Sequence, residues 1–128
     1  MKFTLEQINT IHDHLGNSET LRLYTQALGD LGVIHADSYV TDGHTEFFGA
    51  DGYKVESLPT HEIFTVADTS NKEEFLHQLD LHESGKTSYV QMSKGLAETG
   101  IEKWIIDTQK LTMTFYDKAS NELQVDAL

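Results

Sequence analysis

The sequence has 128 residues, of which 38% are hydrophobic, and its 9 basic and 21 acidic residues give a net charge of −12. A chain of this length fits one domain, here residues 1–128, and can bury a core without metal or disulfide support. The acidic excess argues against direct binding to nucleic acid or to an anionic membrane, because such surfaces need basic residues. The sequence contains no Cys, no apolar run of the roughly 18 residues that a membrane span needs, and no signal-peptide pattern. It therefore predicts a soluble cytoplasmic protein.

The first part of the chain is predicted to form two helices, at residues 4–15 and 18–31, because apolar residues recur there at helical spacing. Thr4 opens a capping-box pattern at the start of the first helix, and Ser18 is placed to cap the second. Gly32 follows the second helix and suits the left-handed conformation that ends many helices.

Three short strands are predicted next, at residues 33–40, 44–48 and 53–58. The pairs Asp42-Gly43 and Asp51-Gly52 separate them and are typical of tight hairpin turns, because Gly accepts positive φ. The pattern therefore predicts an antiparallel meander.

The second part of the chain repeats this order. Residues 62–67 are predicted to form a fourth strand or an extended crossover, and Ser70 begins a second capping-box pattern. Periodicity and glycine positions then predict two helices followed by three strands, at residues 71–83, 87–99, 101–107, 111–116 and 122–127.

An internal duplication explains this common order. A shift of 68 positions places Gly32 on Gly100 and Phe47 on Phe115, so helix-ending glycines and inward apolar positions coincide. We therefore predict an α+β fold with half-units at about 4–58 and 71–128, joined by 59–70, and related by a pseudo-two-fold. The two antiparallel meanders either join or pack on one another, helices cover their inner faces, and a groove lies between the halves. The alternative is that two similar amphipathic runs coincide.

Spaced aromatic residues and glycines form a second pattern over about residues 30–128. Its positions are Tyr39, Asp42-Gly43, Phe48-Gly49, Gly52-Tyr53, Gly85, Tyr89, Ala97, Gly100-Ile101, Trp104, Asp107, Thr112 and Phe115-Tyr116-Asp117. This pattern resembles the YdfO/YbcV-like family of small bacterial and prophage proteins of unknown function, often labelled phage-envelope-like. Met92 departs from it, because an aromatic residue is expected there. The resemblance implies an α+β domain and implies no activity.

The hairpin of residues 35–46 carries the candidate metal site. A two-residue Asp42-Gly43 loop would pair Tyr39 with Glu46. Alternation would then place five polar side chains on one face of the hairpin, namely His35, Asp37, Tyr39, His44 and Glu46. Two imidazoles and two carboxylates (His35, Asp37, His44 and Glu46) could hold a metal ion or transfer protons. The alternative is an ordinary solvated sheet face.

The second hairpin carries the candidate ligand site. Alternation places Asp107 and Tyr116 on its outer face and Trp104 on its inner face. With Tyr39, these residues could bind a small planar ligand, whereas the alternative for Trp104 is a place in the core.

No sequence pattern specifies a reaction, a nucleotide loop or a cofactor site. The sequence therefore favours a non-enzymatic binding or interaction module, whose partner is an unknown protein or small molecule, and which could form a homodimer through strand edges. The first alternative is a small-molecule or metal-dependent enzyme that uses the 35–46 hairpin. The second is an acidic inhibitor of a nucleic-acid-binding protein.

Overall fold

The structure is a computed structural model that describes residues 3–15 and 20–128. Its helices and strands follow the order predicted for the two halves. The first half contains α1 (Leu5–Leu15), α2 (Leu21–Leu31), β1 (His35–Tyr39), β2 (Thr45–Phe48), a short 3-10 turn η1 (Ala50–Gly52) and β3 (Lys54–Glu56). The second half contains α3 (Lys72–Glu83), α4 (Tyr89–Glu98), β4 (Ile101–Asp107), β5 (Thr112–Asp117) and β6 (Glu122–Ala127). The α+β class is confirmed.

The helix ends follow the local chemistry, with one correction. The amide of Gln7 donates to the Thr4 hydroxyl, and the Thr4 amide donates to the Gln7 side chain, which completes the predicted capping box of α1. The cap of α3 is Asn71, not Ser70, because the Asn71 side chain accepts from the Glu74 amide. The predicted Ser18 cap lies outside the described residues.

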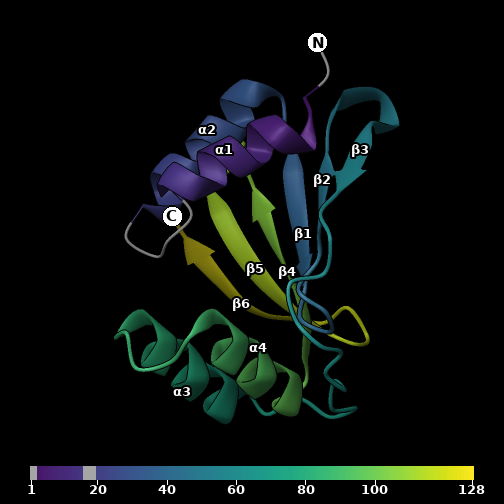
Figure 1. Cartoon of the computed structure of the whole chain (residues 1–128). Helices are drawn as coiled ribbons and strands as arrows, with labels where there is room; N and C mark the ends of the chain where they lie inside the picture. The colour runs from purple at the N-terminus through teal and green to yellow at the C-terminus, as the bar shows by residue number, and fades with distance from the viewer. Residues whose placement is uncertain (1–2, 16–19) are drawn as a thin grey trace.

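The six strands form one antiparallel sheet in the order β3-β2-β1-β4-β5-β6 (Figure 1). The two meanders are joined by β1 and β4, which pair antiparallel from His35↔Asp107 to Tyr39↔Lys103. Of the two predicted arrangements, the structure therefore has the joined sheet. Two helical pairs and this strand order suggest a repeated layout, whereas the two-fold axis itself stays a prediction.

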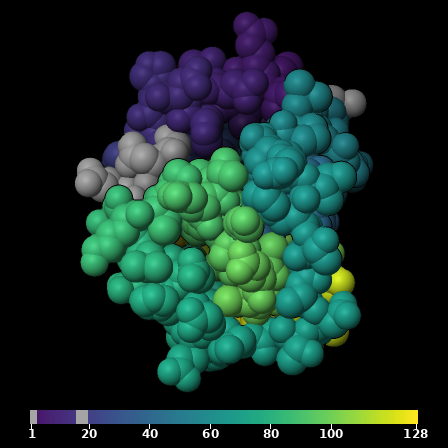
Figure 2. Space-filling model, turned by 60° about the horizontal axis from the view of Figure 1, so that its bottom comes forward, coloured from purple at the N-terminus to yellow at the C-terminus, as the bar shows by residue number. Residues whose placement is uncertain are grey.

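All four described helices lie on the same side of the sheet (Figure 1). The helix residues Ile8 and Leu28 pack with Ala36 on the first meander, and Phe75 and Leu96 pack in the cluster that includes Ile106 on the second. Ala36 and Ile106 are cross-strand partners and therefore point to the same side. Figure 2 shows the purple to blue atoms of the first helical pair and the green atoms of the second on one face of the molecule, with teal atoms from the middle of the chain beside them. None of these helices has both the length and the apolar character needed to cross a bilayer.

Residues 57–71 form an extended crossover, and the structure assigns no strand at 62–67. Val66 is buried in the core cluster that includes Phe75, Leu96 and Ile106. The amides of Ala67 and Asn71 donate to the carbonyls of Ala97 and Thr99, respectively. The crossover is therefore fixed to the end of α4, where the next strand begins.

Candidate functional site

The side of the sheet opposite the helices carries the polar side chains that the sequence singles out. We call it the uncovered face and define it by His35, Asp37, Tyr39, His44, Glu46, Phe48, Lys103, Ile105, Asp107, Thr112, Thr114, Tyr116 and Val125. None of the four described helices lies on it (Figure 1). All of the predicted metal-site residues and three of the four predicted ligand-site residues belong to this face.

The register of the first hairpin differs from the prediction by two residues. Asp37 pairs with Glu46, and the Tyr39 amide donates to the His44 carbonyl, so Tyr39 does not pair with Glu46. The cause is Val40, which is completely buried and whose amide donates to the Glu102 carbonyl in β4. Val40 therefore leaves the hairpin ladder and lengthens the loop. Because side chains alternate with a period of two, the two-residue shift leaves the predicted face unchanged.

A row of three rings and one lysine crosses the uncovered face, from His44 just before β2 to Tyr116 on β5. The rings of His44 and Tyr39 are stacked with centroids 4.7 Å apart and 5° between their planes. The Lys103 ammonium lies 5.7 Å from the Tyr39 centroid and 5.9 Å from that of Tyr116. These rings stand side by side on the sheet, so each of them already has a neighbour on at least one face.

A second row begins at the edge of the first meander. His35 stacks on Phe48 with centroids 4.4 Å apart, and Lys54 lies 5.9 Å from the Phe48 centroid. The Nδ1 atom of His35 lies 2.7 Å from Asp37, which is only 7% exposed. The buried carboxylate is thus hydrogen-bonded, as a buried acid requires.

His44 is held between two carboxylates. Its Nδ1 atom lies 2.5 Å from Asp42 and its Nε2 atom 3.1 Å from Glu46. Burial alone would lower the pKa of His44, but the hydrogen bonds and charges of Asp42 and Glu46 outweigh it and raise the pKa above the usual 6.5. Burial would raise the pKa of Asp42, yet its hydrogen bonds to His44 lower it below the usual 3.8.

We expect this pair of interactions to make stability depend on pH. A raised histidine pKa contributes stability fully below about pH 6.5, and this contribution is lost as the pH rises through the folded-state pKa. A lowered Asp42 pKa contributes stability above about pH 3.8, which is lost as the pH falls through its folded-state value. His44→Gln should therefore lower the free energy of unfolding by about 1 kcal/mol more at pH 5.5 than at pH 9.

Urea denaturation at the two pH values measures this difference. His77→Gln is the matched control, because His77 is an exposed residue of α3 for which the described structure gives no ion pair. An equal effect of His44→Gln at both pH values would contradict the assigned ion pairs.

The four predicted metal-site residues lie on one face but form separate contacts. His35 contacts Asp37, whereas His44 uses both ring nitrogens on Asp42 and Glu46. Among the residues that the structure describes, no group of three or more His, Asp or Glu side chains is arranged to hold a metal ion. Metal binding would require His44 to exchange a carboxylate for the ion, and it stays a prediction.

The predicted ligand-site residues are divided between the two faces. Asp107 and Tyr116 line one hollow of about 260 Å³ on the uncovered face, together with Ile105, Lys110, Thr112, Thr114, Glu122 and Val125. Tyr39 lies next to this hollow across Lys103. Trp104 is 6% exposed and lies in the core beneath α3 and α4. The structure thus brings Asp107, Tyr116 and Tyr39 to one surface and separates Trp104 from them.

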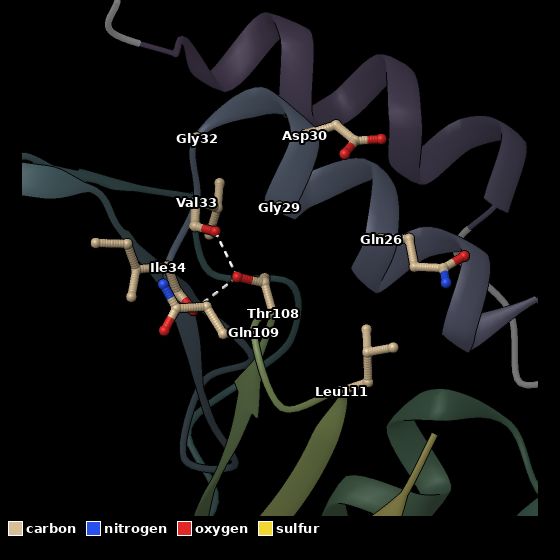
Figure 3. Close-up of a pocket in the computed structure, with 9 residues that line it drawn as sticks. All are labelled: Gln26, Gly29, Asp30, Gly32, Val33, Ile34, Thr108, Gln109 and Leu111. Atoms are coloured by element: carbon tan, nitrogen blue, oxygen red, sulfur yellow. Dashed lines mark hydrogen bonds between the residues drawn. The ribbon is translucent and has the colours of Figure 1, made fainter.

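A second and larger hollow, of about 400 Å³, lies between the halves (Figure 3). Residues 26–34, from the end of α2 to the chain before β1, form one side, and the turn at 108–111 forms the other. The Thr108 hydroxyl lies 2.6 Å from the Val33 carbonyl and 2.8 Å from that of Ile34, and donates its proton between them. This hydroxyl therefore links the two halves by hydrogen bonds, and its proton is already engaged. The predicted groove between the halves matches this position, although no single motif specified its residues.

Taken together, the fold and the site define a small α+β protein with four described helices on one face of a six-stranded sheet and a polar, aromatic opposite face. Residues 9–127 match the model of a family described as Protein of unknown function (DUF1398), and the chain belongs to that family. A comparison with curated proteins gives no match.

Proposed function

We propose that this protein is a non-enzymatic binding module and that the uncovered face is its binding surface. The observation that carries the proposal is the position of all four described helices on the opposite side (Figure 1). The uncovered face retains apolar side chains between its polar ones, including Ile105 and the 48% exposed Val125. A mixed apolar and polar surface of this kind is typical of protein interfaces.

Charge favours a basic protein as the partner. The uncovered face and its rim carry the carboxylates Asp37, Asp42, Glu46, Glu56, Asp107 and Glu122. Two of its cations are already engaged, since Lys54 contacts Glu46 and Glu56 while Lys103 lies over two tyrosine rings. Lys110 beside the hollow is a third cation, and the carboxylates outnumber these lysines. A second copy of the chain would bring another net charge of −12, so a positively charged partner meets less repulsion.

The tyrosines of this surface support binding over acid–base catalysis. Burial, followed by the charges of Glu46 and Asp37, raises the pKa of Tyr39 above its usual 10.0. Burial and Glu122 act in the same direction on the pKa of Tyr116. Both hydroxyls therefore keep their protons at neutral pH and can donate hydrogen bonds to a partner.

A charge placed on the uncovered face tests the proposal. Val125→Arg should lower the affinity for a peptide of alternating Lys and Val at least about tenfold, because it adds a like charge and removes an apolar contact. Val90→Arg is the matched control, since Val90 lies on α4 and is 41% exposed against 48% for Val125. The affinities are measured by fluorescence anisotropy, and chemical-shift mapping locates the peptide on the labelled protein. Equal weakening by both variants, or shifts confined to the helices, would exclude the uncovered face.

A metal-dependent enzyme on the 35–46 hairpin is the first alternative. Its support is the hydrogen-bonded His35–Asp37 pair beside the His44 cluster. A Zn²⁺ titration with thermal melting tests it, because an ion that binds only the folded state raises the melting temperature. If the hairpin binds zinc, the rise should be lost in His44→Gln and kept in His77→Gln. No rise in the unaltered protein would refute this alternative.

An acidic inhibitor of a nucleic-acid-binding protein is the second alternative, and it uses the same attraction to a basic partner. Competition with duplex DNA for a basic DNA-binding protein distinguishes it, because an inhibitor of this kind displaces DNA whereas a general binding module does not.

The spaced aromatic and glycine pattern also supports a finer family assignment as YdfO/YbcV-like. A cytoplasmic location is a further proposal, whereas a homodimer through strand edges is the alternative that the net charge of −12 disfavours.

A further inference from the structure

The strand β6 forms one edge of the sheet and borders the hollow on the uncovered face. Its only neighbour in the sheet is β5, and it has six residues, whereas the opposite edge strand β3 has three. The strand contains neither Pro nor Lys, two residues that commonly prevent a free edge from pairing. Among the described strands, β6 therefore offers the longer edge for another strand.

The register shows which backbone groups of β6 point away from the sheet. The Leu128 amide donates to the Leu111 carbonyl, and β5 and β6 then pair as Thr112↔Ala127, Met113↔Asp126 and Thr114↔Val125. Bonded and non-bonded pairs alternate in an antiparallel ladder. The N–H groups of Val125 and Ala127 therefore point outward, and that of Asp126 points toward β5.

Side chains next to this edge indicate what kind of strand would pair with it. Val125 is 48% exposed and points to the uncovered face, beside the hollow that Glu122 also lines. Two carboxylates lie on β6 itself: Glu122 on the uncovered face, and Asp126 on the opposite face, where it accepts a hydrogen bond from the Gln124 side chain. Pairing of two copies of β6 would bring four such carboxylates together, whereas a strand with Lys or Arg would complement them.

We propose that β6 binds an extended basic segment of a partner protein by strand addition. The segment forms backbone hydrogen bonds with the outward groups of Val125 and Ala127. Its apolar side chains lie beside Val125 on the uncovered face, and its basic side chains lie beside Asp126 on the opposite face. This proposal rests on the proposed binding function of the uncovered face, and it adds the edge and the backbone mode by which the partner would be recognised.

Proline scanning with the alternating Lys and Val peptide tests the backbone mode. Val125→Pro removes an outward N–H without removing a bond to β5, and proline is tolerated at such edge positions. We expect it to lower the peptide affinity at least about tenfold relative to Val125→Ala, which keeps the N–H and loses most of the side chain. Ala127→Pro should act in the same way, and it serves as the second variant if Val125→Pro fails to fold.

A peptide methylated on alternate backbone nitrogens is the second test. It keeps every side chain and charge but cannot donate along one edge, so it should bind at least about tenfold more weakly than its parent. The outward amides of Val125 and Ala127 should also become protected from hydrogen exchange when the parent peptide binds.

The outcomes distinguish this inference from the broader proposal. Equal binding of the methylated peptide, with Val125→Pro no weaker than Val125→Ala, would overturn strand addition. In that case, weaker binding by Val125→Arg would still support the uncovered face as the binding surface. If Val125→Arg does not weaken binding, both the proposed surface and strand addition are refuted. Self-association that sedimentation detects and that Val125→Pro abolishes would identify a second copy as the occupant and overturn the basic partner.

Discussion

Gly100→Ala is expected to lower the free energy of unfolding by about 2–4 kcal/mol, the combined effect of left-handed backbone and steric overlap. Gly100 has φ of +91°, which favours glycine. A Cβ atom there would lie 2.6 Å from the Ser70 Cα and 2.8 Å from the Thr69 carbonyl oxygen. These neighbours are backbone atoms of the crossover, whose Asn71 amide is bonded to Thr99, so they cannot move aside independently.

Gly85→Ala is the matched control for this prediction. Gly85 also has positive φ, +78°, but no heavy atom lies within 4 Å of the position that a Cβ would take. Only the conformational cost applies, and we expect a loss of about 1 kcal/mol. Denaturant unfolding of the two variants measures the difference. An effect of Gly100→Ala no larger than that of Gly85→Ala would contradict the docking of the crossover against the start of β4.

Phe115→Ala is expected to lower the free energy of unfolding by about 3–5 kcal/mol. Phe115 is 1% exposed, and its ring centroid lies 5.1 Å from that of Phe75 on α3 and 6.1 Å from that of Trp104 on β4. Its removal would leave a cavity between the sheet and the helices that these neighbours can fill only in part. Tryptophan fluorescence provides a second readout, because water entering the cavity should shift the Trp104 emission to longer wavelength.

Phe48→Ala is the control on the opposite side of the sheet. Phe48 is partly buried and stacks on His35 on the uncovered face, without a helix above it. We expect a loss of about 1 kcal/mol and no change in Trp104 emission, because less apolar area returns to water. Equal losses from Phe115→Ala and Phe48→Ala would contradict the assignment of the two faces.

Most of the fold could be predicted because local patterns in this sequence are strong. Both helical pairs have apolar residues at helical spacing, and Gly32 and Gly100 adopt the left-handed conformation expected at helix ends. The predicted N-cap of α3, Ser70, was wrong by one residue. Both Ser70 and Asn71 have cap-forming side chains, and local sequence does not choose between them.

The candidate site was predicted less completely. Alternation identified the polar face of the 35–46 hairpin and the position of Asp107 and Tyr116 on the same side. It did not identify Lys103 between two tyrosine rings or Glu122 in the hollow, because both contacts cross between strands. A ligand site that includes Trp104 was proposed from residue type, whereas burial beneath α3 and α4 depends on packing.

The sequence by itself determined which residues form helices and strands and which side of each strand is polar, because these properties depend on periods of 3.6 and 2 within short segments. Only the tertiary structure decided that β1 and β4 join the meanders into one sheet and that Val40 leaves the hairpin to bond with Glu102. These outcomes depend on pairing between residues more than 60 positions apart, where burial of side chains from both halves selects among registers that local patterns allow equally.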